Sequence, residues 1–289
     1  MLNEEVKKVI LNAQKNEITE YFIYKKLSET VKESGNKEIL KRISDDELKH
    51  YKLWREYTNK DVKPNKIKFL IYFLISKIFG ITFGIKLMEK GEKIAKANYE
   101  KVSEFIIDAK SIERDEDEHE KKLINLIDEE RLKYFSSMVL GLNDALVELT
   151  GALAGFTLTL QNTRLIAIIG LITGLAASLS MATSEYLSTK SEGNAKNPFK
   201  AAIYTGIAYI FTVLFLISPY MILTNVYLCL SLTIIIAIII IFLFTFYISV
   251  AKDLQFRKRF LEMIIISLGI AGLTFIIGFF VKVFLNIEV

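Results

Sequence analysis

Five long apolar runs in the second half of the chain constrain its fold more than any other feature. They cover residues 137–160, 165–187, 199–223, 226–250 and 261–285. Each reaches or exceeds the ~20 residues that a helix needs to cross a bilayer. The charges agree with this pattern, because only 9 of the 37 basic and 7 of the 33 acidic residues come after Phe135. We therefore expect five transmembrane helices.

The first 133 residues are polar and helical in pattern. Lys and Glu are interleaved there as on solvated helix faces, and apolar residues recur at three- and four-residue spacing. The pattern predicts four main helices over residues 2–34, 37–58, 83–107 and 109–133, with a turn at residues 59–65. We expect two domains, residues 1–133 and 134–289, in an all-α fold. The net charge of +4 is small, so composition predicts no nucleic-acid partner.

Residues 67–87 allow two interpretations. The stretch is apolar over about a spanning length, but it contains Lys77, Lys86 and two glycines. It is either a membrane-surface or re-entrant helix, or a crossover helix buried within the domain or a dimer. A further span would move half of the bundle across the membrane, so we expect an element that does not span.

A repeated motif in the first half points to metal chemistry. The chain has two histidines, His50 and His119, and each comes three residues after a glutamate, which places both side chains on one helix face. Each Glu-x-x-His also follows a Glu-x6-Tyr on another predicted helix. The predicted ligands are four carboxylates and two imidazoles: Glu17, Glu47, His50, Glu92, Glu116 and His119. This is the ligand set of a di-iron carboxylate four-helix bundle; such ligands suit Fe(II), and also Mn or Zn.

With this motif, residues 1–133 resemble the rubrerythrin branch of the ferritin-like superfamily. The resemblance implies a ferritin-like four-helix bundle and an extra or third-site ligand role for Glu89. Glu20, one helical turn from Glu17, is either a further ligand or a surface charge. Cys229 is the one cysteine of the chain, so the Cys-x-x-Cys segment of a rubredoxin module is missing, which argues against a complete peroxidase cycle.

Ionisable residues in the first two apolar runs indicate an ion path. Asp144 and Glu148 are four residues apart, as are Met181 and Glu185, so each pair shares a helix face. Ionisable groups within spans normally face a bundle interior or an aqueous path. A thioether beside carboxylates fits a borderline ion such as Fe²⁺. Met181 alone is compatible with packing and Glu185 with an interfacial position, whereas a structural Asp in a span is rare.

Two segments around these residues resemble the vacuolar iron transporter family. They are Gly-Leu-Asn-Asp-Ala-Leu-Val-Glu-Leu-Thr-Gly-Ala-Leu-Ala-Gly at 141–155 and Ser-Met-Ala-Thr-Ser-Glu-Tyr-Leu-Ser at 180–188. The resemblance extends over about residues 134–289. It implies a five-span homodimer that moves Fe²⁺ or Mn²⁺ out of the cytosol in exchange for protons, with transport roles for Asp144, Met181 and Glu185.

The chain departs from that family in one loop. Stand-alone members carry a Glu-rich cytoplasmic segment between spans two and three, whereas this loop covers only about residues 189–197. The N-terminal bundle is expected to take its place as the metal-receiving domain. This domain order resembles the membrane-bound ferritin proteins of prokaryotes, which implies a prokaryotic cell membrane. Two glycine pairs, Gly151 with Gly155 and Gly170 with Gly174, would allow close helix approach at a dimer interface.

Basic residues in the loops predict the orientation. They gather in the second-to-third and fourth-to-fifth connections, as Lys190, Lys196, Lys200, Lys252, Arg257, Lys258 and Arg259. The first-to-second connection has only Arg164, and the third-to-fourth has no charge. By the positive-inside rule, the soluble domain faces the cytoplasm and the C-terminus lies outside.

Three functions are compatible with these features. The leading one is an iron exporter whose bundle collects, senses or oxidises the metal. The second is a membrane-anchored ferroxidase or peroxidase, which explains the bundle but not the polar faces of the spans. The third is a regulator in which metal occupancy of the bundle gates the transporter. The sequence leaves open whether the chain is an enzyme and whether it prefers iron or manganese.

Overall fold

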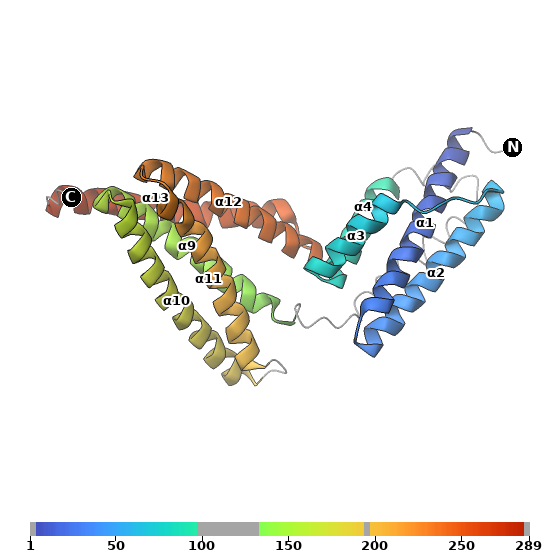
Figure 1. The fold of residues 1–289 in the computed structure, drawn as a ribbon, viewed down its shortest axis with the longest axis horizontal. Helices are drawn as coiled ribbons and strands as arrows, with labels where there is room; N and C mark the ends of the chain where they lie inside the picture. Colours follow the sequence, from blue (N-terminus) through green and yellow to red (C-terminus); the bar gives the residue numbers. More distant parts are fainter. Residues whose placement is uncertain (1–3, 97–132, 194–196, 286–289) are drawn as a thin grey trace. The chain divides into compact units, whose positions relative to one another are not determined.

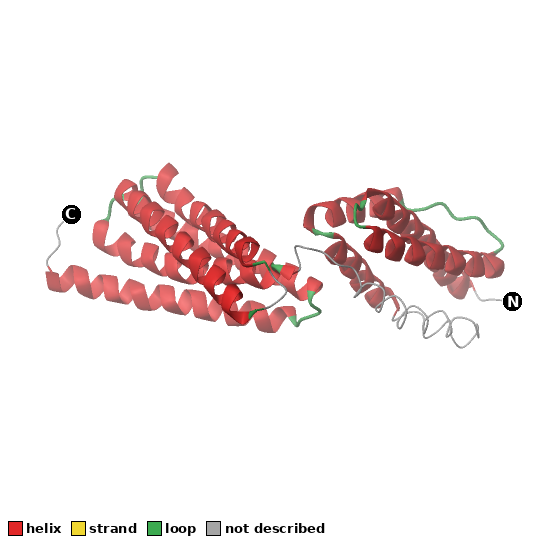
Figure 2. Ribbon diagram, turned by 90° about the horizontal axis from the view of Figure 1, so that it is seen from below, coloured by secondary structure: helices red, strands yellow, loops and turns green. Residues whose placement is uncertain are grey.

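The computed structural model describes residues 4–96, 133–193 and 197–285 (Figure 1). Within these ranges every regular element is an α-helix (Figure 2), which confirms the all-α fold class. The chain divides into two compact units, Met1–Glu129 and Glu130–Val289. Each unit is described by itself.

The first unit begins with a helical pair, α1 (Glu4–Thr30) and α2 (Ser34–Thr58), which pack along each other (Figure 1). Two apolar clusters lie at different positions along the axes of these two helices. One combines Val6, Ile10, Ala13 and Trp54, and the other combines Ile23, Tyr24, Leu27, Leu40 and Ile43 with residues of α4. The polar positions predicted as metal ligands fall between these clusters along both helices. The apolar packing therefore holds that polar layer in place.

The connection after α2 is hydrogen-bonded to α1. Asn59 ends the helix with a left-handed backbone, at φ 50°. The side-chain amide of Gln14 donates to the carbonyl of Lys60 at 2.7 Å, and the backbone N–H of Asn65 donates to Thr19 Oγ1 at 2.9 Å. These bonds satisfy backbone groups that the turn leaves without helical partners. The turn therefore directs the chain back along α1.

The apolar stretch at residues 67–87 forms parts of two helices. They are α3 (Lys66–Phe79) and α4 (Ile81–Lys96), and the chain breaks between them at Gly80, where φ is 106°. Gly84 then packs directly against Ser76, where a side chain would collide. A helix of 14 residues is about 21 Å long, short of the ~30 Å hydrocarbon core. In line with the expected element that does not span, neither helix is a candidate span among the described residues.

The second unit contains the candidate spans. In its described residues these are α9 (Phe135–Leu160), α10 (Thr163–Glu192), α11 (Pro198–Ile222), α12 (Val226–Ala251) and α13 (Phe256–Leu285). All five are long and apolar enough to cross a bilayer. Asn162, Asn197 and Asn225 cap three of them, because each side-chain oxygen accepts a backbone N–H of the first turn.

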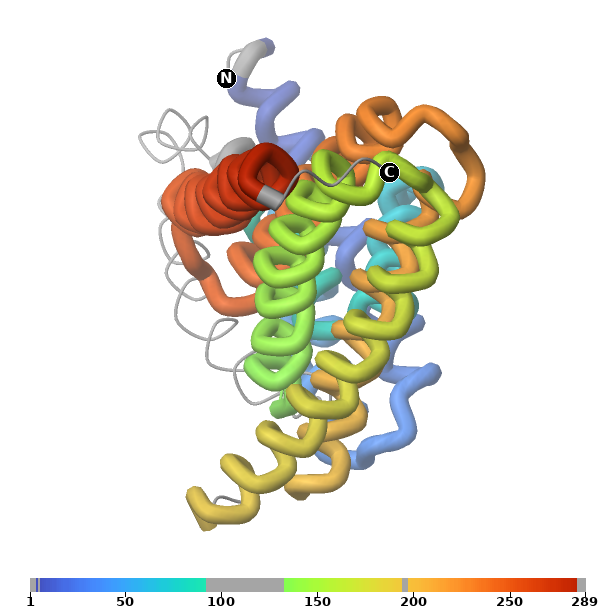
Figure 3. The backbone as a smooth tube through the Cα atoms, turned by 90° about the vertical axis from the view of Figure 1, so that its left-hand side faces the viewer, coloured from blue at the N-terminus to red at the C-terminus, as the bar shows by residue number. Residues whose placement is uncertain are grey.

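Helix α9 is central to this unit and lies between α10 and α13 (Figure 3). Small residues allow the close approach. Gly141 packs against the backbone of Thr205 in α11, and a side chain at Gly278 in α13 would come within 2.9 Å of the Gly155 carbonyl. Thr274 Oγ1 donates to the carbonyl of Gly151 at 2.7 Å. The α9–α13 crossing is therefore a contact between backbones.

The two glycine pairs do not serve the role that we expected for them. Gly151 and Gly155 face α13, while Gly170 and Gly174 face Ile217 and Val213 of α11. These contacts lie within one chain. The close packing that the glycines allow is therefore used inside the monomer fold, and they do not support a dimer interface.

Candidate functional site

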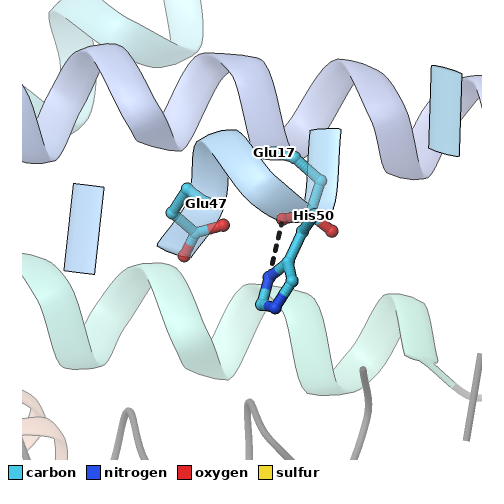
Figure 4. Close-up of side chains that lie close together, drawn as sticks. All are labelled: Glu17, Glu47 and His50. Atoms are coloured by element: carbon cyan, nitrogen blue, oxygen red, sulfur yellow. Dashed lines mark ion pairs between the residues drawn. The ribbon is translucent and has the colours of Figure 1, made fainter. Parts of the chain in front are cut away.

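Three predicted ligands come together in the first unit. Glu17 extends from α1, and Glu47 and His50 extend from α2, one helical turn apart (Figure 4). Each offers one ligand atom, and these atoms all lie within 4.8 Å of one another. His50 Nδ1 is 3.8 Å from Glu17 Oε2, and both carboxylates are buried at 5% exposure.

The charge of this cluster favours a cation. Burial by itself raises the pKa of Glu17, but the neighbouring side chains of His50, Glu47 and Trp54 outweigh burial and lower that pKa. If both carboxylates were ionised, they would repel each other by about 3 kcal/mol at a separation of about 5 Å and the effective dielectric constant of protein sites. A divalent ion between Glu17 and Glu47 would turn this repulsion into attraction.

The geometry also fits a metal ion. Two ligands that each lie about 2.1 Å from one ion are at most about 4.2 Å apart. The ligand atoms of Glu17, Glu47 and His50 lie within 4.8 Å of one another, so small side-chain movements would complete coordination. Two carboxylates and one imidazole suit Fe²⁺, Mn²⁺ or Zn²⁺. The arrangement is therefore compatible with metal binding and leaves the identity of the metal open.

The other half of the predicted di-metal site lies outside the described residues. This applies to Glu116, to His119 and to the side chain of Glu92 near the end of α4. The two-metal centre and the ferritin-like bundle around it therefore stay predictions.

Trp54 contacts the candidate site, and the sequence did not predict this contact. Its indole Nε1–H donates to Glu17 Oε1 at 3.3 Å, and its ring is 1% exposed. Such a donor orients a ligating carboxylate from outside the coordination sphere. The available signal was its spacing, because Trp54 comes four residues after His50 and so shares a face of α2.

The two weaker candidates lie outside this cluster of described residues. Glu20 is buried at 3% exposure, so it is not a surface charge, and its Oε1 pairs with Lys68 Nζ at 2.8 Å. Lys68 also donates to Asn16 Oδ1 at 3.3 Å. Glu20 therefore joins α1 to α3. Glu89 lies half-buried on α4.

In the second unit, Asp144 and Glu148 lie one turn apart near the middle of α9. The hydroxyl of Tyr209 in α11 donates to Glu148 Oε2 at 2.7 Å. Asp144 is half-buried and interacts electrostatically with both of these groups. Tyr209 could not be predicted as a site residue, since a tyrosine in an apolar run carries no local sign of a carboxylate partner. Three oxygen-bearing side chains thus meet within the spans.

Glu185 lies in a second polar group. Ser137 Oγ of α9 donates to Glu185 Oε1 at 2.6 Å, and Thr189 Oγ1 is 3.5 Å from the same oxygen. Met181 lies one turn before Glu185 and is half-buried against the apolar core of the unit. Ser137 comes seven residues before Asp144, which is about 10 Å along α9. The two polar groups are therefore offset along one helix.

One end of this unit is basic. The backbone N–H of Asn197 donates to Tyr134 OH at 3.0 Å, and Lys252 Nζ lies 5.3 Å from the ring centroid of Phe135. These contacts bring together the start of α9, the α10–α11 connection and the end of α12 at one end of the unit. We call this the basic end, because the Lys and Arg residues of the two basic loops surround it in the sequence. Glu185 lies toward it.

Comparison with known proteins gives one family match. Residues 135–196 match the VIT family, a segment that contains α9, α10 and all four polar residues predicted for the path. No curated protein and no solved structure matches the chain. The match indicates transport of metal ions across a membrane. Together with the five candidate spans, it indicates an integral membrane protein in which residues 135–196 are similar to the VIT family.

Proposed function

We propose that this protein exports a divalent metal ion, Fe²⁺ or Mn²⁺, from the cytosol. The proposed path uses the four polar residues of the first two spans: Asp144, Glu148, Met181 and Glu185. The observation that carries the proposal is the pairing of two intramembrane carboxylates with hydroxyl groups of neighbouring helices, Glu148 with Tyr209 and Glu185 with Ser137. Ionisable groups in apolar spans are costly, and their usual use is an ion path.

The order of these groups along α9 supports a direction. The basic end would face the cytoplasm by the positive-inside rule, together with the N-terminal unit, and the C-terminus would face outside. Glu185 would then accept the ion near the cytoplasmic side and Asp144 would hold it deeper in the membrane. The soft thioether of Met181 would favour Fe²⁺ over Mg²⁺ or Ca²⁺.

Proton exchange is part of the proposal. A carboxylate in an apolar environment is stable when it carries a proton or binds a cation. Asp144 can therefore release a metal ion when it takes up a proton from outside, and release that proton when the next ion arrives. Export of the ion would then be coupled to proton entry. The proposal includes a homodimer, but the glycine pairs would not form its interface.

The N-terminal unit would receive the metal before transport. Glu17, Glu47 and His50 offer two carboxylates and an imidazole in a buried position. When bound there, iron would supply redox chemistry, and the buried ligands would limit its contact with water. Trp54 would keep Glu17 in position through its indole N–H. Collection, sensing or oxidation of the ion are all compatible with this arrangement.

The test is transport by purified protein in liposomes loaded with a Fe²⁺-sensitive dye. Asp144→Asn nearly preserves the side-chain volume but removes its charge and its exchangeable proton. We expect it to abolish Fe²⁺ flux and leave protein abundance and metal content of the N-terminal unit unchanged. Asn143→Asp serves as the matched control, since it adds a carboxylate at the neighbouring position of α9. Parental flux in Asp144→Asn would refute the proposed path.

A membrane-anchored ferroxidase is the second candidate, and the buried Glu17, Glu47 and His50 cluster is the observation that favours it. His50→Ala separates the two. If the protein is an exporter, this variant loses metal from the N-terminal unit but still moves ions at high external Fe²⁺. If it is an anchored enzyme, the parental protein oxidises Fe²⁺ without moving ions, and His50→Ala abolishes the oxidation.

A further inference from the structure

The outer face of α3 is apolar and exposed. It consists of Ile67 and the residues three, four, seven and eleven positions later, Leu70, Ile71, Leu74 and Ile78. This spacing places them on one side of the helix. Their exposure ranges from 44% at Leu74 to 72% at Ile67. A soluble domain rarely exposes such a continuous apolar row.

The opposite face of α3 is packed and fixed. Phe69, Tyr72 and Phe73 pack against the buried cluster of α1, α2 and α4. Lys68 forms the buried ion pair with Glu20 of α1 at 2.8 Å. The helix therefore cannot rotate its apolar row inward without the loss of these contacts. Among the described residues, the row is a fixed surface of the unit, which we call the α3 face.

The charge around the α3 face has one sign. Between Asp61 and Glu89 the sequence contains no acidic residue but five lysines: Lys63, Lys66, Lys68, Lys77 and Lys86. Lys66 and Lys77 are exposed and lie along one edge of the apolar row at helical spacing. This contrasts with the rest of the first half, where acidic and basic residues are interleaved. An apolar row with a lysine edge is typical of helices that lie in a membrane interface.

We propose that the α3 face docks on the surface of the bilayer, with its apolar row among the acyl chains and its lysines at anionic headgroups. The same chain has five helices in its second unit that are long and apolar enough to cross a bilayer, so a lipid surface would lie close to the first unit. A helix of 14 residues is too short to cross that bilayer. A parallel position at the interface satisfies both the apolar row and the lysines.

A second copy of the chain fits the α3 face less well. In a two-fold dimer the same patch meets itself, so with α3 antiparallel to its copy Lys66 and Lys77 of one protomer would meet the equivalent positive edge of the other. No acidic residue of α3 is present to balance them. Anionic lipid headgroups complement that charge, and juxtamembrane lysines are attracted to them.

The consequence is a fixed placement of the metal cluster above the membrane. Lys68 of α3 binds Glu20, which lies three residues after Glu17 on α1. Docking of α3 would therefore hold the ligand helix at a set distance from the lipid surface. This inference concerns lipid contact and does not depend on which ion is transported.

Fluorescence quenching by lipid tests the proposal in the full-length protein. Ile71→Cys in a Cys229→Ser background would carry an environment-sensitive label in nanodiscs that contain phosphatidylglycerol and spin-labelled lipid. We expect the spin label to remove about half or more of the fluorescence, because interfacial helices insert their apolar face ~5–10 Å. Lys41→Cys on α2, exposed among charges of both signs, is the matched control and should keep its intensity.

Charge variants and solvent controls complete the test. Lys66→Gln and Lys77→Gln should each lower the ratio of docked to undocked protein about fivefold in anionic lipid, while circular dichroism stays unchanged. The label could instead be blue-shifted both in nanodiscs and in detergent, without quenching by the spin-labelled lipid. That result would show that protein covers the face, either a second copy or residues 97–132. That result, or a label that stays in water, overturns the proposal.

Discussion

The hydroxyl of Tyr209 donates to Glu148 Oε2 at 2.7 Å and so joins the middle of α11 to the middle of α9. The tyrosine ring is 1% exposed, which fixes the position of the hydroxyl. A hydrogen bond to a carboxylate is among the stronger polar interactions in proteins. The pair therefore sets where a carboxylate oxygen stands within the proposed path.

Loss of this hydroxyl should slow transport. Tyr209→Phe retains the ring and removes the donor to Glu148, so the carboxylate is free to move. We expect Fe²⁺ flux in proteoliposomes to fall about tenfold, which corresponds to about 1.4 kcal/mol, at the low end of a hydrogen bond to a charged group. Tyr220→Phe is the control, since it removes a buried hydroxyl of the same helix that bonds Thr157 instead. Equal losses in both variants would argue against a specific role for Tyr209.

Selectivity should depend on the thioether of Met181. Met181→Leu nearly conserves the volume and the packing against the apolar core, but it removes the one soft ligand of the proposed path. We expect competition assays to show a weaker preference for Fe²⁺ over Mg²⁺ and Ca²⁺, with a smaller change in the Fe²⁺ rate. An unchanged preference would assign Met181 to packing alone.

Metal affinity of the first unit should depend on Trp54. Trp54→Phe removes the indole donor to Glu17 Oε1 and retains an aromatic ring. Loss of a partner that orients a metal ligand typically weakens metal binding about 10–100-fold. Titration of the full-length protein with Fe²⁺ or Mn²⁺ measures this, and His50→Ala should weaken binding further. Tyr57→Phe on the same helix is the control and should bind metal as the parent does.

Stability of the second unit should depend on glycines inside the chain. A Cβ at Gly174 would come within 2.6 Å of Val213 Cγ1, so Gly174→Ala should destabilise the unit by about 1–3 kcal/mol through overpacking. A Cβ at Gly269 would meet open space, so Gly269→Ala should leave the unfolding temperature in detergent unchanged or raise it slightly, because alanine favours a helix more than glycine does. If Gly174→Ala instead shifted the oligomeric state at constant stability, the glycine would belong to a subunit interface.

Local periodicity determined much of this protein. Five runs of spanning length became five helices that begin within five residues of their expected starts, because hydrophobic length is a property of the segment itself. The pairs Glu47 with His50 and Asp144 with Glu148 share helix faces for the same reason, since residues three and four apart are always neighbours on a helix.

Contacts between helices were decided only by the tertiary structure. Only the folded structure shows that the chain breaks at Gly80, where α4 packs back onto α3. Likewise, only the fold shows that Glu20 is buried in an ion pair with Lys68. Trp54 and Tyr209 lie 37 and 61 residues from their carboxylate partners, so no local pattern could pair them. Which faces meet depends on how whole helices cross and interlock. The residue types that carry the chemistry could therefore be read from the sequence, whereas the donors that position them could be identified only in the folded chain.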